Sequence, residues 1–274
     1  MEPALLQDGL AVASGAAVGF SLGLVGGGGS ILAVPLLFYV VGIGSPHLAI
    51  GTSSVAVAAS AALSLIGHAR ARTVKWPCAA IFAAAGVIGA VAGAALGKAV
   101  DGNALLALFG LLMIGVGLAM LRGRRGGDAP DVRLTRQTAP RLLPLLGATG
   151  LAVGFASGFF GIGGGFLIVP GLVVATAMPI VNAIGSSLVS VTAFGATTAA
   201  SYAASGLVDW PTAGFFIVGG ALGSLSGTGL ARQLADRGRI LTLIFASIVI
   251  FASIVIGAGL YVALKGFSAG LVRS

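Results

Sequence analysis

Four consecutive glycines at residues 26–29 interrupt an apolar segment near the start of the chain, and they constrain its fold more than any other feature. Each glycine costs about 1 kcal/mol relative to alanine inside a helix, so a helix breaks here. In hydrocarbon, a break leaves backbone N–H and C=O groups unpaired at a cost of several kcal/mol each. The break must therefore be buried in protein or line a polar cavity, as substrate sites in transporters do.

A second copy of this segment occurs later in the chain. Residues 19–35 align without gaps on residues 154–170, and nine of the 17 pairs are identical. After one deletion the match resumes, with Gly51 on Gly185 and Trp76 on Trp210, each pair 134 residues apart. The chain is therefore an internal duplication. Interrupted apolar segments at corresponding positions of two halves point to a transporter binding site.

The composition places the chain in a lipid bilayer. Of its 274 residues, 57% are hydrophobic and only 8% are charged, and the mean hydropathy is +1.09. These values are typical of a polytopic membrane protein. The basic residues lie in loops beside apolar segments, so they indicate topology, and we expect no nucleic-acid partner.

Cysteine and histidine offer little chemistry. The single cysteine, Cys78, excludes an internal disulfide and a multi-cysteine metal site, and we interpret it as a small buried side chain. His47 and His68 fall near the ends of predicted spans, which favours an interfacial role. Val181 and Tyr202 take their places in the second half, which excludes a pair of equivalent proton sites. We expect no cofactor, no metal and no catalytic residue.

Ten apolar segments are predicted, five in each half. Two arms open each half, and the first pair would be about 24 and 20 Å long as helices, against a hydrocarbon core of about 30 Å. This favours a hairpin whose glycine tip ends inside the membrane, with a kink at Pro35, although two tilted crossings also fit. The arms are 10–25, 31–43, 142–160 and 166–177, and the spans are 47–68, 76–97, 104–121, 181–205, 210–231 and 240–264.

Loop charges predict the orientation of the halves. The loop that carries Arg70, Arg72 and Lys75 is basic, whereas its counterpart carries only Asp209, so the two loops should face opposite sides. We therefore predict an all-α polytopic membrane protein with both termini outside the cytoplasm. Its two inverted repeats, residues 1–121 and 142–274, would each contain a Gly-tipped helical hairpin plus three transmembrane helices, joined by a cytoplasmic basic linker at 122–141.

Three duplicated motifs carry a family resemblance: the glycine tip followed by Leu-x-Val-Pro, the Gly-Thr-Ser segment at 51–53 and the Trp-Pro pair at 76–77. Together they resemble the sulfite exporter TauE/SafE family of membrane anion permeases. The resemblance covers nearly the whole chain. It implies a multi-pass transporter of sulfite, organosulfonates or related small sulfur oxyanions in a bacterial inner membrane. It leaves the particular anion and a homo-oligomeric state open.

The candidate substrate site combines the glycine tips with hydroxyl side chains. An interrupted helix presents free N–H groups at its positive end, and glycine lets the backbone approach an anion, although tight helix packing is the alternative explanation. Hydroxyl groups can donate to an oxyanion, although they can equally bond to the preceding helical turn. The candidates are Gly26, Gly27, Gly28, Gly29, Ser30, Thr52, Ser53, Ser54, Gly161, Gly163, Gly164, Gly165, Ser186 and Ser187.

The remaining glycine pattern is assigned to packing. Gly86, Gly89 and Gly93 recur at helical spacing in both halves, which is typical of helix interfaces in membranes. By contrast, the depths of the tips and of the Gly-Ser segments predict that each tip approaches the Gly-Ser segment of the other half.

Two other functions fit the sequence less well. An intramembrane hydrolase would need Ser54 and His68 to meet, but 14 residues of continuous helix separate them by about 21 Å. A cation channel or carrier would need acidic ligands, but no Asp or Glu lies inside a predicted span. The sequence therefore favours an anion exporter that works by alternating access around the two tips.

Overall fold

The computed structural model describes residues 2–121, 137–161, 165–234 and seven positions between 240 and 250, and this part of the chain contains helices and no strand. Six of the described helical segments are long and apolar enough to cross a membrane. The predicted all-α membrane class is thereby confirmed for the described residues. Residues 122–136, which include most of the predicted linker, and most of the predicted last span lie outside them.

Helices in the first half follow the predicted segments closely. Ser45 accepts a hydrogen bond from Leu48 N at 3.2 Å and caps the second long helix, which has proline in its first turn. The first helix starts earlier than predicted, so Asp8 is helical. The elements are α1 (Glu2–Val25), the 3-10 helix η1 (Gly26–Leu32), α2 (Ala33–Pro35), the π-helix η2 (Leu36–Val40), α3 (Pro46–Arg70), α4 (Trp76–Ala99) and α5 (Gly102–Leu121).

The second half repeats this order within its described residues. Asp209 caps the last complete helix by accepting from Thr212 N, and Pro211 occupies the first turn. The first helix of this half begins at Ala139, three residues inside the predicted linker. The elements are α6 (Ala139–Phe160), α7 (Gly165–Thr176), α8 (Ile180–Ala203) and α9 (Trp210–Gln233).

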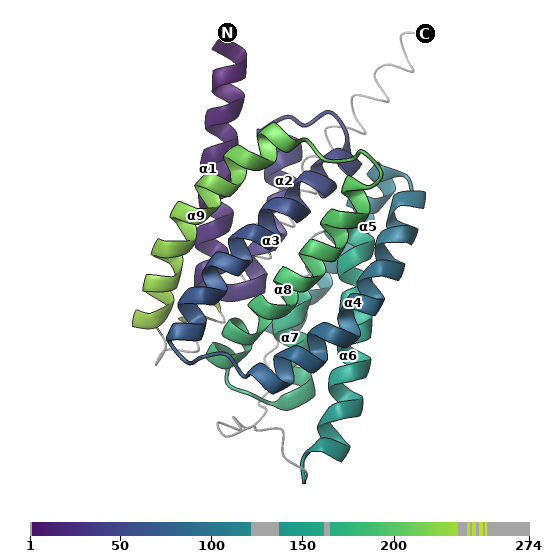
Figure 1. Cartoon of the computed structure of the whole chain (residues 1–274), viewed down its shortest axis with the longest axis vertical. Helices are drawn as coiled ribbons and strands as arrows, with labels where there is room; N and C mark the ends of the chain where they lie inside the picture. The colour runs from purple at the N-terminus through teal and green to yellow at the C-terminus, as the bar shows by residue number, and fades with distance from the viewer. Residues whose placement is uncertain are drawn as a thin grey trace.

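The chain reverses direction at the first glycine run. Gly26 has a φ of +65°, a left-handed conformation that ends α1, and η1 follows. The return arm then runs back beside α1 (Figure 1), and its helix type changes from α to π directly after Pro35. Gln7 Nε2 donates to Val41 O at 3.2 Å, so the end of the return arm lies beside the start of α1.

Each first arm packs against a helix of the opposite half. Helix α1 lies along α9, α6 lies along α4, and α3 and α8 cross between them (Figure 1). A Cβ atom added at Gly19 would fall on the backbone of Gly220, and one added at Gly154 would fall on the backbone of Gly86. The predicted packing role of Gly86, Gly89 and Gly93 is confirmed. A Cβ atom at Gly89 or Gly93 would fall on the backbone of α6, and one at Gly86 would fall on the ring of Phe194 in α8.

Corresponding loops lie at opposite ends of the bundle (Figure 1). We call the end that holds the loop between α3 and α4, with Arg70, Arg72 and Lys75, the basic end. Helix α6 starts and α9 finishes at the basic end, whereas the loop with Asp209 and the start of α1 lie at the other end. Helices α3 and α8 therefore run in opposite directions.

Left-handed backbone conformations recur in pairs. Among the described residues, positive φ angles occur at Gly26 and Gly161, at Gly42 and Ala177, and at Arg72 and Gly206. The members of each pair are 135, 135 and 134 residues apart, which is the offset of the sequence duplication. The two halves thus share their turns as well as their helices.

We predict that Gly42→Ala destabilises the protein by about 1 kcal/mol, because a left-handed conformation disfavours any Cβ atom. Gly42 has a φ of +80° and open space around it, so backbone strain is the only cost. Ala177→Gly should give a smaller stabilisation by relieving the same strain at a φ of +57°. Thermal unfolding in detergent measures both changes in stability. If the two variants shifted the melting temperature in the same direction by the same amount, backbone strain would not explain the effects.

A second prediction tests the contacts between halves. Gly19→Ala and Gly154→Ala should each destabilise the protein by about 1–3 kcal/mol, because the new methyl group meets backbone that cannot move aside. Gly9→Ala in α1 and Gly147→Ala in α6 are matched controls with nothing within 4 Å, so they should be neutral or slightly stabilising. Similar melting temperatures for all four variants would refute the close packing.

Candidate substrate site at the glycine tips

The two glycine tips meet inside the helical bundle. A Cβ atom added at Gly27 would fall on the backbone of Gly165, and the reverse also holds. Gly26 packs against Ile184, and a Cβ there would lie 2.7 Å from Ile184 O. Gly161 faces the side chain of Ile50. In this conformation Gly27 and Gly165 are therefore packing residues that close the meeting point of the tips.

Hydrogen bonds also join each tip to the opposite half. Gly27 N donates to Ser187 Oγ at 3.0 Å, and Ser54 Oγ lies 2.7 Å from Gly161 O and 2.8 Å from Ile50 O, both of which can accept its proton. All of these groups are buried. The prediction that each tip approaches the Gly-Ser segment of the other half agrees with these contacts.

Two of the candidate hydroxyl groups instead hold helix starts. Thr52 Oγ1 accepts from Asp209 N at 3.0 Å, and Ser186 Oγ accepts from Lys75 N at 2.9 Å. These bonds are equivalent in the duplication, and each fixes the residue before a Trp-Pro helix. The structure thus gives Thr52 and Ser186 a role in joining the halves, away from the contact between the tips.

Most of the other candidates make contacts within their own half of the chain, and two lie outside the described residues. Ser30 Oγ donates to Gly27 O at 2.9 Å, and Ser53 Oγ donates to Ile50 O at 2.9 Å. Gly28 and Gly29 are buried within η1, where Gly29 packs on the backbone of Leu22. Gly163 and Gly164 lie outside the described residues.

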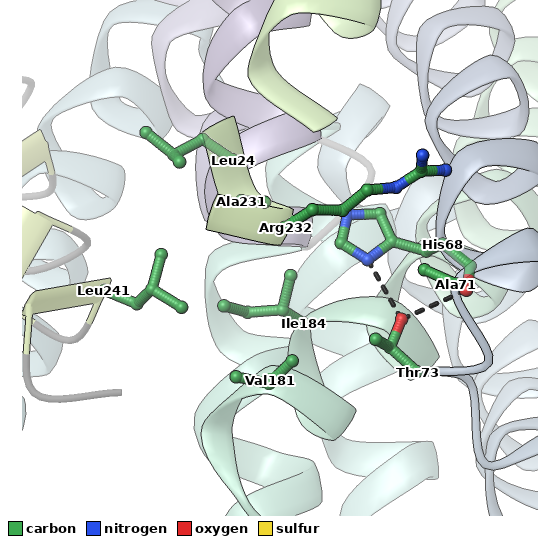
Figure 2. Close-up of a pocket in the computed structure, with 9 residues that line it drawn as sticks. All are labelled: Leu24, His68, Ala71, Thr73, Val181, Ile184, Ala231, Arg232 and Leu241. Carbon is green, nitrogen blue, oxygen red and sulfur yellow. Dashed lines mark hydrogen bonds between the residues drawn. The ribbon is translucent and has the colours of Figure 1, made fainter. Parts of the chain in front are cut away.

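A cavity of about 240 Å³ at the basic end was not predicted (Figure 2). Its wall includes His68, which is only 2% exposed, so the interfacial interpretation of this histidine is wrong. His68 Nε2 lies 2.9 Å from Gly23 O, and Nδ1 lies 3.1 Å from Thr73 Oγ1. Arg232 also lines the cavity. The sequence holds one sign of this cavity: a basic residue recurs at equivalent positions of the two halves, Lys98 and Arg232, which are 134 residues apart.

Six described helical segments of membrane-spanning length define a polytopic membrane protein, and the buried helix break at Gly26–Leu32 is typical of transporters. The model of the sulfite exporter TauE/SafE family matches residues 11–256. The chain belongs to this family and is a multi-pass membrane transporter. No solved structure matches it.

Relatives carry names of the same class. A protein of Xylella fastidiosa strain 9a5c, named "Probable membrane transporter protein", is 54% identical over 239 residues, which cover 87% of this chain and 90% of the relative. "Probable membrane transporter protein YunE" of Bacillus subtilis strain 168 is 26% identical over 244 residues, which cover 83% and 89%. Neither name states a substrate.

We predict that Ser187→Ala destabilises the protein by about 1–3 kcal/mol, because it leaves the buried N–H of Gly27 without a partner. Ser190→Ala, one turn further along α8, is the matched control, since the Ser190 hydroxyl is buried and has no partner among the described residues. This control should be neutral. Equal losses of stability in chemical denaturation of the two variants would show that the bond between the first tip and α8 contributes nothing.

Proposed function

We propose that this transporter exports a small sulfur oxyanion, such as sulfite or an organosulfonate, across a bacterial inner membrane. Transport would occur by alternating access between two inverted halves around a site at the glycine tips. The carrying observation is that two interrupted segments, one from each half, meet at buried glycines and bond to hydroxyl groups across the meeting point. The opposite directions of α3 and α8 support the inverted arrangement.

The closed tips suggest how the site would operate. The backbones of Gly27 and Gly165 are in contact, so an anion can enter only when the tips separate. When Gly27 also moves away from Ser187, the Gly27 N–H is freed and can donate to an oxyanion. Ser187 Oγ already donates to Ile184 O at 2.7 Å, so it must turn away from this carbonyl before it can donate to an anion. A site that exists only when two halves move apart is suited to alternating access.

Electrical energy is sufficient for export. An anion that leaves an inside-negative cell gains about 2.3 kcal/mol per charge per 100 mV, equivalent to a concentration ratio of roughly 50 for a monoanion. Export as a uniport therefore needs no coupling ion. Import would need one, for which carbonyl groups exposed at the helix breaks could bind sodium.

The rival functions have less support in the described residues. No group of three or more His, Cys, Asp or Glu side chains there could hold a metal ion. A hydrolase would need a histidine beside a serine, and the hydrogen-bonding partners of His68 are Gly23 and Thr73. Neither observation favours a cation carrier or an enzyme.

Reconstituted vesicles test the proposed function. With a potassium diffusion potential of either sign and no proton or sodium gradient, we expect sulfite flux whose direction follows the potential, and no sodium or nickel flux. Gly27→Ala should abolish the flux because its methyl group displaces the opposite tip, whereas Gly9→Ala should transport normally. Flux that ignores the potential and follows an imposed proton or sodium gradient would overturn the uniport. Normal transport by Gly27→Ala would move the site away from the tips.

A further inference from the structure

The cavity at the basic end has one polar wall and one apolar wall (Figure 2). His68, Thr73 and Arg232 lie together on one side, and Leu24, Val181, Ile184 and Leu241 form most of the other. Its described lining contains one full positive charge, that of Arg232, and no acidic side chain. The volume of about 240 Å³ holds several non-hydrogen atoms, since about 10–15 Å³ measured in this way already holds a water molecule.

Arg232 has the donor geometry that an oxyanion requires. The guanidinium group carries five N–H donors in a planar fork that can bind two oxygen atoms of one anion. The structure shows one of its nitrogens donating to a protein group, Gly67 O at 2.9 Å. The side chain is exposed and its guanidinium group is directed past His68, away from the apolar wall (Figure 2), so it turns inward to bind an anion in the cavity. The hydroxyl of Thr73 lies on the same wall, 3.1 Å from both His68 O and His68 Nδ1, so it donates to an anion only when it turns away from these two partners.

Hydrogen bonds connect the lining of the cavity to the first glycine tip. Ile184 lines it, and the Ile184 carbonyl accepts from Ser187 Oγ at 2.7 Å, the same hydroxyl that accepts from Gly27 N. On the polar wall, His68 Nε2 must donate to Gly23 O, because a carbonyl only accepts. Both walls therefore bond to the backbone at or just before the tip.

The equivalent positions at the opposite end are filled differently. Val181, His68 and Leu24 correspond to His47, Tyr202 and Phe159, which are larger or comparable in size and aromatic. The counterpart of Arg232 is Lys98, which donates to Ser201 O at 3.1 Å and to Ser205 Oγ at 3.0 Å. Its ammonium group also lies 5.8 Å from the centre of the Tyr202 ring. Both ends thus carry a cation at equivalent positions. At the basic end its surroundings include the aliphatic side chains of the cavity, whereas aromatic side chains take several of these places at the opposite end.

We propose that the cavity at the basic end is a capture site in which Arg232 and Thr73 bind a free compact oxyanion before it reaches the glycine tips. The binding itself needs only the cavity, whereas its place in transport rests on the proposed function. A phosphate of an anionic lipid headgroup shares the same chemistry, so the test separates these two sources. His68 acts as a positioning residue that connects the cavity to the tip through Gly23.

The test measures binding of radiolabelled sulfite to the whole protein in nanodiscs made only of phosphatidylcholine. Arg232→Ala should weaken binding about ten- to hundredfold, because charge-assisted hydrogen bonds to the anion are lost. Arg232→Lys, which keeps the charge and loses the fork, should lie between. In vesicles, Arg232→Ala should raise the half-saturating sulfite concentration at the basic end and leave the maximal rate closer to that of the wild type.

Two matched controls separate binding from other roles of Arg232. Arg70→Ala removes a charge from the same end without changing the cavity lining, and it should bind sulfite like the wild type. Lys98→Ala removes the equivalent bond to a helix-end carbonyl, so it should reproduce any loss of stability without the loss of binding. If Arg232→Ala binds sulfite as tightly as Arg70→Ala does, the capture site is refuted.

Lipid dependence provides the remaining outcome. Adding phosphatidylglycerol to the nanodiscs should leave sulfite binding unchanged within about twofold. A tenfold loss that disappears in Arg232→Ala would assign the cavity to a lipid phosphate and overturn the capture of a free anion. The proposed function fails separately if wild-type vesicles show no sulfite flux, whatever the binding to Arg232. The capture site alone fails if flux depends on Gly27 but not on Arg232.

Discussion

Backbone contact between helices of opposite halves is the constraint on which the rest of the structure depends. In a bilayer, helices gain nothing from hydrophobic burial against one another, so close packing and hydrogen bonds must hold them together. Gly19 on Gly220 and Gly154 on Gly86 bring the backbones of α1 and α9, and of α6 and α4, into direct contact. Because each contact joins one half to the other, neither half can pack in this way alone.

The packing of each first arm against the opposite half also positions the tips. Each tip is the continuation of a first arm, and each first arm is fixed against the opposite half, so the tip is delivered to a surface of that half. Gly26 against Ile184 and Gly161 against Ile50 are the result. The bonds from Asp209 N to Thr52 and from Lys75 N to Ser186 then lock the starts of α9 and α4 to the same two segments. The meeting point is thus supported from both halves at once.

Much of this fold could be predicted from the sequence because the duplication shows the main structural motifs twice. Helix breaks, Trp-Pro helix starts and packing glycines were each seen twice, and the described helices follow them within a few residues at most boundaries. Hydroxyl roles could not be predicted in the same way. Thr52 and Ser53 are adjacent, yet one joins the opposite half and the other bonds to its own helix. Only the three-dimensional partners distinguish them.

The burial of His68 was missed for a related reason. Its position near the end of α3 places it at a span boundary in the sequence, where an interfacial side chain is the usual outcome, but α1 and α9 extend over it in space. The two halves share a framework. Their left-handed turns are paired, and Lys98 and Arg232 each bond to a carbonyl near the end of a helix in the other half. The side chains around these two cations differ between the halves. Two equivalent ends would bind a substrate equally well, so a preference for one side of the membrane can arise only where the side chains at the two ends differ. His68 and Tyr202 occupy equivalent positions. Among the described contacts, His68 bonds to the backbone of α1 at Gly23, just before the first tip, whereas the Tyr202 hydroxyl has no partner.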